Sequence, residues 1–272
     1  MNVLKGKNNH ATIMFFNTKI KTFADGSQHV KYHNYISTKG NAKKESSGVL
    51  TEEERKRKRY NNLYSTKQNL IDLAYHNALE TPWQYFITLE FNANEIDYKN
   101  YEKVSELLSK FLDNLKHQNK DMRYIMVPEF HPTTGGIHFH GLLSNVPNLK
   151  LKEAINPNNN KIIRKNGCVI YNLINYKLGY STISEIKNQE AVSVYMAKYM
   201  TKQLIDLNYK KRYWSSKNLK RPTIQYAHMT EDYLKFYIDI NEIKDYYEGK
   251  NLIFFKTSVL HNDNIMETKK DK

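Results

Sequence analysis

The chain lacks several features that would otherwise define its class. It holds a single cysteine, Cys168, in 272 residues, which excludes an internal disulfide and fits a reducing compartment. It has no apolar run of about 18 residues and no signal peptide, so we expect a cytoplasmic protein that contacts no membrane. It also lacks a Gly-Lys-Ser/Thr nucleotide-binding loop, so ATP-driven work would fall to another chain.

Acidic residues are too few to balance the basic ones. Lys and Arg number 42 against 28 Asp and Glu, which gives a formal net charge of +14 and an isoelectric point of about 9.4. Such an excess is expected of a protein that neutralises phosphates. The sequence is also rich in Asn, Ile and Tyr, a mixture typical of AT-rich coding, so part of the charge is compositional. A nucleic acid remains the expected partner.

The most informative segment is Gly-Gly-Ile-His-Phe-His-Gly-Leu-Leu at residues 135–143. Side chains alternate along a strand, so His138 and His140 point to one face and Phe139 points to the other. Two imidazoles on one face provide half of a divalent metal site. For an isolated His-x-His pair, the alternative is a surface or packing role.

A second motif follows at residues 192–202, which contain no Gly or Pro and carry apolar residues four apart, a helical pattern. On that helix Tyr195 and Tyr199 share a face, with Lys198 and Lys202 in a row beside them. A tyrosine hydroxyl aimed at a metal-polarised electrophile is a possible nucleophile, and a neighbouring lysine can bind phosphate and favour the phenolate. Taken alone, such a helix could be an ordinary amphipathic surface.

Together the two motifs resemble those of the HUH endonuclease superfamily, specifically the rolling-circle replication initiators (Rep) of single-stranded DNA phages and small plasmids. Residues 83–91, Trp-Gln-Tyr-Phe-Ile-Thr-Leu-Glu-Phe, resemble the first motif of that family, although Glu90 stands where a Thr is usual. The segment Lys211–Pro222 also reads like the initiators of bacterial phages. The resemblance covers roughly residues 55–222.

The resemblance implies a site-specific DNA endonuclease and strand transferase. Such an enzyme nicks and rejoins single-stranded DNA at a replication origin through a 5′-phosphotyrosine intermediate, in the cytoplasm of a bacterial host. Helicase and polymerase would act in trans. Tyr195 and Tyr199 both fit the Tyr-x-x-Lys spacing, and which of them attacks first stays open.

A third metal ligand is expected from the strand that precedes the histidines. The family supplies a polar ligand, often a carboxylate, from this position, which favours Glu129. His131 shares its strand parity and is the rival, and an edge-strand charge is the structural alternative. Two imidazoles and one carboxylate suit Mn²⁺ and tolerate Mg²⁺. Zinc is disfavoured because no cysteine or further His-Asp cluster completes a tetrahedral set.

A basic-aromatic cluster after the tyrosine helix is of the kind that single-stranded DNA prefers. Its members are Tyr213, Trp214, Lys217, Lys220 and Arg221. The alternative is a core tryptophan among solvated lysines. The basic run at residues 55–59 could likewise follow a DNA backbone or be a solvated helix face.

The pattern of elements predicts an α+β fold, a central antiparallel sheet with helices packed on it, as in an HUH/RRM-like sandwich. We expect an N-terminal hairpin at Asp25-Gly26 and a linker in residues 1–50, the endonuclease domain in 51–230, and an extension with a disordered tail (262–272) in 231–272. The expected domain elements are a helix at 51–78 that starts with a capping box, strands at 85–91, 123–129 and around the histidines, helices at 101–116 and 190–205, and a last strand at 223–229.

Three other functions compete with the initiator. A relaxase or transposase of the same superfamily would share the chemistry, whereas a non-catalytic nucleic-acid-binding protein would form no covalent DNA adduct. A zinc hydrolase would hold stoichiometric zinc and also form no adduct.

Overall fold

The computed structural model describes residues 5–8, 11–39, 50–200, 204 and 211–258. They divide into two compact units, unit 1 (residues 1–49 and 221–272) and unit 2 (residues 50–220). The expected linker at residues 40–49 and the expected tail at 262–272 lie outside the described residues. Among the helices that are described, none combines the length and the apolar composition that a membrane span requires.

Unit 2 is built on a seven-stranded sheet in the order β12-β5-β6-β4-β11-β10-β7, with antiparallel pairing throughout. The strands are β4 (Tyr85–Leu89), β5 (Arg123–Phe130), β6 (Ile137–Ser144), β7 (Leu151–Glu153), β10 (Tyr171–Leu173), β11 (Ser181–Glu185) and β12 (Trp214–Ser215). The expected α+β fold with an antiparallel sheet is confirmed.

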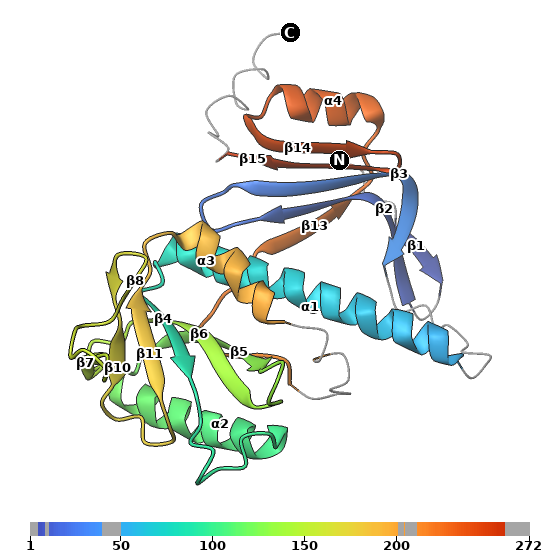
Figure 1. Ribbon diagram of the computed structural model, residues 1–272. Coiled ribbons are helices and arrows are strands. Elements are labelled where there is room, and N and C mark those ends of the chain that lie inside the picture. Colours follow the sequence, from blue (N-terminus) through green and yellow to red (C-terminus); the bar gives the residue numbers. More distant parts are fainter. Residues whose placement is uncertain (1–4, 9–10, 40–49, 201–203, 205–210, 259–272) are drawn as a thin grey trace. The chain divides into compact units, whose positions relative to one another are not determined.

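Helices cover both faces of this sheet (Figure 1). α2 (Tyr101–Gln118) packs on one face, where Phe139 and Leu143 of β6 point. α1 (Glu52–Glu80) and α3 (Gln189–Met196) pack on the other face, to which Leu142 contributes. The alternation along β6 thus separates an apolar layer under α2 from the histidine layer under α1 and α3.

Local signals fix both ends of α1. The Thr51 hydroxyl accepts from the Glu54 amide, and the Glu54 carboxylate accepts from the Thr51 amide, which is the expected capping box. At the other end, the guanidinium of Arg123 donates to the carbonyls of Asn77 and Thr81. These bonds satisfy carbonyls that a helix end leaves unpaired and tie α1 to β5.

The tyrosine helix is shorter than expected. α3 ends at Met196, and a single 3-10 turn, η1 (Ala197–Tyr199), continues the chain. The Met200 amide donates to Ala197, three residues back, so the turn is tighter than an α-helical one. The expectation of one α-helix from 190 to 205 is therefore wrong, and Lys202 lies outside the described residues.

Two contacts place α3 against β4. The Gln189 side chain accepts from the Trp83 amide and donates to the Trp83 carbonyl, and the Asn188 side chain caps the helix by accepting from the Ala191 amide. Nearby, a hairpin of β8 (Arg164–Lys165) and β9 (Cys168–Val169) turns at Asn166 and Gly167. Both turn residues have positive φ, as a type I′ turn requires and as the Asn-Gly pair predicts.

Unit 1 holds a six-stranded sheet in the order β1-β2-β3-β15-β14, with β13 also paired to β2. Its elements are β1 (Lys5–Asn8), β2 (Ala11–Thr22), β3 (Gln28–Lys39), β13 (Thr223–Ala227), α4 (Glu231–Asp239), β14 (Ile243–Gly249) and β15 (Leu252–Thr257). The expected hairpin turn is present, with Gly26 at positive φ and Ser27 bonded to Asp25.

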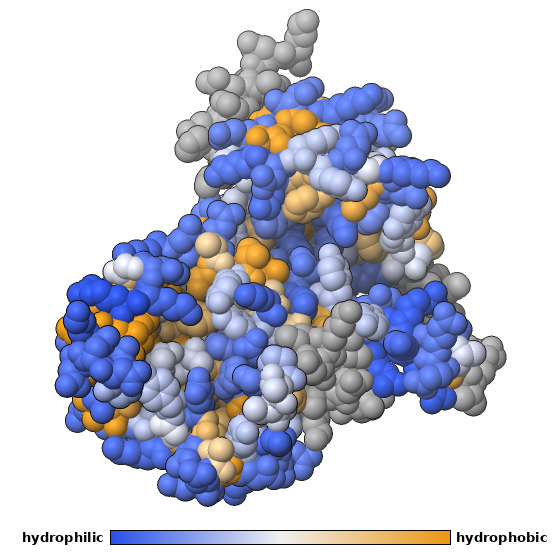
Figure 2. All heavy atoms as spheres, viewed as in Figure 1, coloured by the Kyte–Doolittle hydropathy of each residue, from blue (hydrophilic) through white to orange (hydrophobic). Residues whose placement is uncertain are grey.

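The C-terminal strands correct two expectations. The sequence places the strand at residues 223–229 in the catalytic sheet, but β13 pairs with β2 in unit 1. It also treats the N-terminal hairpin and the C-terminal extension as separate additions, yet β15 pairs with β3. Ile20, Val30 and Phe255 form one buried row with Leu234 of α4 above them, which explains why the two ends of the chain associate. In the view of Figure 2 the surface is mainly hydrophilic and its hydrophobic residues form small, separate patches.

Gly141 of β6 offers a test of the sheet. A Cβ at this position would lie 2.0 Å from the Met126 sulfur and 2.6 Å from the Ile125 carbonyl oxygen. We expect Gly141→Ala to lower the free energy of unfolding by about 1–3 kcal/mol through overpacking, measured by urea denaturation. Ser184→Ala on β11 is the control and should stay within about 0.5 kcal/mol. Equal stability of Gly141→Ala and the unaltered chain would contradict this close packing.

Candidate metal centre and tyrosine pair

Strand register brings three potential metal ligands together. β5 and β6 pair antiparallel with Glu129 opposite His138 and Val127 opposite His140. Directly opposed residues point to the same face of a sheet, and residues two apart on one strand share that face. Glu129, His138 and His140 therefore all project from the face that α1 and α3 cover.

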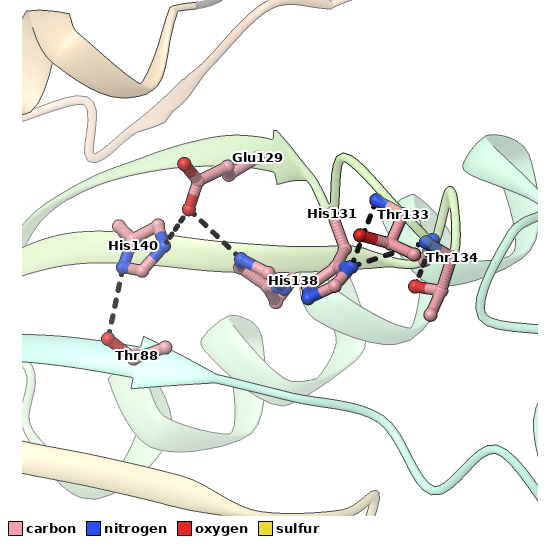
Figure 3. A network of polar contacts seen from close by, with 8 residues as sticks. Thr88, Glu129, His131, Thr133, Thr134, His138 and His140 are labelled. Carbon is pink, nitrogen blue, oxygen red and sulfur yellow. Dashed lines mark hydrogen bonds and ion pairs between the residues drawn. The ribbon is translucent and has the colours of Figure 1, made fainter.

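The three side chains meet at one carboxylate oxygen (Figure 3). Glu129 Oε2 lies 3.0 Å from His138 Nε2 and 2.7 Å from His140 Nε2. All three ligand atoms fall within 4.8 Å of one another. Neighbouring ligands of an octahedral ion with bonds of ~2.1 Å are ~3 Å apart, so these separations fit a small divalent cation. The donor set of two nitrogens and one oxygen fits it as well.

A threonine on the adjacent strand orients His140. Thr88 of β4 stands opposite His140, and its Oγ1 lies 3.0 Å from His140 Nδ1. A hydrogen bond at Nδ1 fixes the ring so that Nε2 points to Glu129. With a metal at Nε2, the Nδ1–H would donate to the same hydroxyl. The sequence reasoning missed Thr88, because only the β4–β6 pairing reveals it.

Burial and hydrogen bonding set the charge state of the cluster. Burial lowers the pKa of His140 to about 4, against the raising effect of Glu129, so this imidazole is neutral near pH 7. Burial alone would raise the pKa of Glu129, but hydrogen bonds from His138 and His140 outweigh it and hold the pKa below its usual value. A neutral imidazole beside an ionised carboxylate is the protonation state in which both can ligate a metal.

His131, the rival ligand, points elsewhere. Its Nδ1 accepts from the backbone amides of Thr133 and Thr134, at 3.4 Å and 3.2 Å, inside the turn between β5 and β6 (Figure 3). Among the described residues it does not belong to the metal-ligating group. The structure therefore favours Glu129 for the third position.

The tyrosines lie on the same face as this cluster. The Tyr199 ring stacks on His140, with centroids 3.7 Å apart and planes 15° from parallel. Tyr195 meets Tyr199 edge to face at 5.2 Å, and Phe86 of β4 lies 5.7 Å from Tyr195. The exposed Lys198 places its Nζ 5.4 Å from the centre of the Tyr195 ring. The two motifs of the sequence are thus brought together.

The two phenols occupy different environments. Tyr199 is 6% exposed and Tyr195 is 42% exposed. Burial raises the pKa of the Tyr199 phenol, and a hydrogen bond and charge from Tyr195 and the charge of Glu129 raise it further. Tyr195 also borders a groove of about 370 Å³ that runs over β4 and β11. Other residues that line this groove include Phe86, Thr88, Lys165, Asn166, Cys168 and Asn188.

The basic-aromatic cluster is not one surface. Trp214 is 3% exposed and packs edge to face on Phe139 within the α2 core, so it cannot stack on a base; its assignment to DNA binding is wrong. Tyr213 packs partly against the other core. Lys217 is exposed, Lys220 forms an ion pair with Glu80 at 2.7 Å, and Arg221 begins the second segment of unit 1.

One comparison with known proteins gives a match. Residues 84–204 match a family model of replication-associated proteins, the ORF2 type. No curated protein and no solved structure matches. The matched segment contains Glu129, both histidines and both tyrosines, and it excludes unit 1. The similarity indicates a protein of DNA replication that interacts with DNA.

The position of Trp214 yields a prediction. Trp214→Ala should lower the free energy of unfolding by about 3–5 kcal/mol, because it empties a core position, as measured by urea denaturation. Trp214→Phe should be milder and should leave the affinity for a single-stranded oligonucleotide unchanged. If Trp214→Phe lost DNA affinity while keeping its stability, the indole would be a DNA contact after all.

Proposed function

We propose that this protein is a rolling-circle replication initiator of the HUH type, which nicks and rejoins single-stranded origin DNA through a 5′-phosphotyrosine link. The observation that carries the proposal is the convergence of Glu129, His138 and His140 with Tyr195 and Tyr199 on one face of the unit 2 sheet. The nicking activity would reside in unit 2, and the match to a replication-associated family supports the biological setting.

The ligand group would hold Mn²⁺ or Mg²⁺. Glu129 Oε2 and the two imidazole Nε2 atoms supply three ligands and leave positions open for water and a phosphate oxygen. When bound, the cation withdraws charge from the scissile phosphate and fixes its position. Thr88 holds His140 in the required orientation, and the stacked Tyr199 ring covers one side of that imidazole.

Tyr195 is the better candidate for the first attack. Its hydroxyl is carried by an exposed ring at the edge of the groove, whereas the Tyr199 phenol is buried and resists ionisation. The Tyr195 oxygen forms a bond to phosphorus as the bond from phosphorus to the 3′-oxygen breaks. The phenol proton passes to solvent and the leaving oxygen takes up a proton, which gives a free 3′-hydroxyl. Lys198 supplies positive charge beside the ring.

Tyr199 would act in the second transfer. The phosphotyrosine link retains the energy of the phosphodiester, so a second tyrosine or the 3′-hydroxyl can attack it and release Tyr195. Ring centroids 5.2 Å apart allow such a relay without a change of site. Lys202 would serve Tyr199 as Lys198 serves Tyr195, according to the repeated Tyr-x-x-Lys spacing.

The groove beside Tyr195 would receive the DNA next to the scissile phosphate. Phe86 offers an aromatic surface and Lys165 a positive charge, and both are features of single-strand binding sites. Lys217, Lys220, Arg221 and the partly buried Tyr213 would flank this path as backbone contacts, without Trp214. The free 3′-hydroxyl would prime a host polymerase, and a host helicase would act in trans in the bacterial cytoplasm.

Replacement of each tyrosine tests the chemistry. Tyr195→Phe should reduce the covalent DNA adduct on a single-stranded origin oligonucleotide on the order of 10³-fold or more, because the nucleophile is lost. Tyr199→Phe should retain the first cleavage and lose the second transfer. Adduct formation is read by gel shift after denaturation, with Tyr180→Phe, another exposed tyrosine of unit 2, as the control. Nicking that survives Tyr195→Phe/Tyr199→Phe would end the proposal.

The orienting threonine tests the metal site. Thr88→Val should lower Mn²⁺ affinity by about 10–100-fold, because the bond that fixes His140 is lost. Thr182→Val is the matched control, since Thr182 stands opposite Thr88 on β11, one strand further from the ligand group. Affinity is measured by calorimetric titration with Mn²⁺. A Glu129→Gln variant that binds Mn²⁺ as tightly as the unaltered chain would exclude Glu129 as a ligand.

A further inference from the structure

Unit 1 carries a sheet with two unlike faces. One face holds the buried row Ile20, Val30 and Phe255, which packs under Leu234 of α4. These three residues stand opposite one another on β2, β3 and β15. Figure 1 shows α4 lying along one side of this sheet. The apolar core of unit 1 therefore uses only one side of its sheet.

The neighbouring residues on the same strands form a row on the other face. Register pairs Tyr226 with Lys19, Lys19 with Lys31, Lys31 with Phe254, and Phe254 with Tyr247. Each of these residues is one position away from the row under α4, so all five point away from it. We call the set Tyr226, Lys19, Lys31, Phe254 and Tyr247 the lysine-aromatic row.

The next row on this face is also basic. It places Lys21 opposite His29 and His29 opposite Lys256. Lys256 is paired with Asp245 at 2.7 Å. Burial, together with the charges of Lys256 and Lys21, lowers the pKa of His29 to about 4. The two rows contain four lysines and one aspartate, so the face has a net positive charge.

The arrangement costs the fold stability. Lysines directly opposite each other on paired strands repel and destabilise a sheet. In the described part of the chain, neither Lys19 nor Lys31 forms an ion pair. Lys39 brings a further ammonium to within 4.0 Å of the Tyr226 ring centre. A polyanion that lies across the row would relieve this repulsion.

We propose that the lysine-aromatic row of unit 1 is a second binding surface for single-stranded DNA, separate from the tyrosine and histidine site of unit 2. Lys19 and Lys31 would bind successive backbone phosphates, while Phe254 and the exposed Tyr247 would stack on bases. Single strands are favoured over duplex because only unpaired bases offer their faces to such rings. The surface would bind DNA without regard to sequence and whether or not unit 2 nicks it.

Charge reversal in the full chain tests the surface. Lys19→Glu/Lys31→Glu should weaken binding of a labelled thymidine oligonucleotide of about 30 nucleotides by about tenfold or more at low salt. It should also reduce the magnitude of the slope of log K against log salt by ~1.4, for two lost phosphate contacts. The control is Lys235→Glu/Lys250→Glu, the same charge change beside α4. Equal weakening in both variants would show a net-charge effect only and overturn the proposal.

Two further variants separate binding from structure. Lys31→Glu places opposite charges on Lys19 and position 31, so it should raise the melting temperature while it weakens DNA binding; a lower melting temperature would indicate a structural role. Phe254→Leu/Tyr247→Leu should weaken single-strand binding more than duplex binding. Equal loss on both, or none, would overturn the stacking role.

The outcome is independent of the nicking proposal. Lys19→Glu/Lys31→Glu should retain adduct formation at a saturating concentration of a short origin oligonucleotide, since it leaves unit 2 unchanged. Tyr195→Phe should retain thymidine-oligonucleotide binding. If Tyr195→Phe and the lysine variant each lost both properties, the two surfaces would not be separate.

Discussion

The register between β5 and β6 is the constraint on which the candidate site depends. With Glu129 opposite His138, one carboxylate oxygen lies within 3.0 Å of an Nε2 atom on each histidine. A shift of one residue would turn Glu129 to the α2 face and leave the imidazoles without a carboxylate. The register is held by residues outside the site. Phe139 fills the core under α2, and the absence of a side chain at Gly141 lets Met126 pack closely.

The second constraint is the junction of α3 with the sheet. Gln189 ties the start of this helix to the backbone of Trp83, so the following turns pass over β4 and β6. Tyr199 then meets His140, while Tyr195 remains exposed beside the groove. Two chemically identical residues thereby acquire different reactivities. Burial raises the pKa of one phenol, and access to DNA favours the other, a distinction that spacing along the helix could not supply.

Local signals predicted much of the site, and nonlocal pairing accounts for the rest. The shared face of His138 and His140, the Thr51 capping box and the Asn166-Gly167 turn all follow from neighbours in the sequence. Thr88 required the β4–β6 pairing, and Trp214 sits in the core because β12 pairs with β5. The association of β3 with β15 joins residues more than 200 positions apart, which no short pattern encodes. The end of α3 at Met196 also escaped, because helical periodicity continues past it.

Both units contain charge arrangements that their cores do not need. In unit 2 a partly buried carboxylate draws two imidazoles into contact, and its desolvation is offset only by those hydrogen bonds. In unit 1 two lysines oppose each other on the face away from α4, although an uncharged pair would be more stable. A cation would complete the first arrangement and a polyanion the second. The two ligands are complementary for a protein that must cut one DNA linkage while it holds the strand elsewhere. The same chain can therefore separate chemistry from retention, with each function assigned to a different sheet.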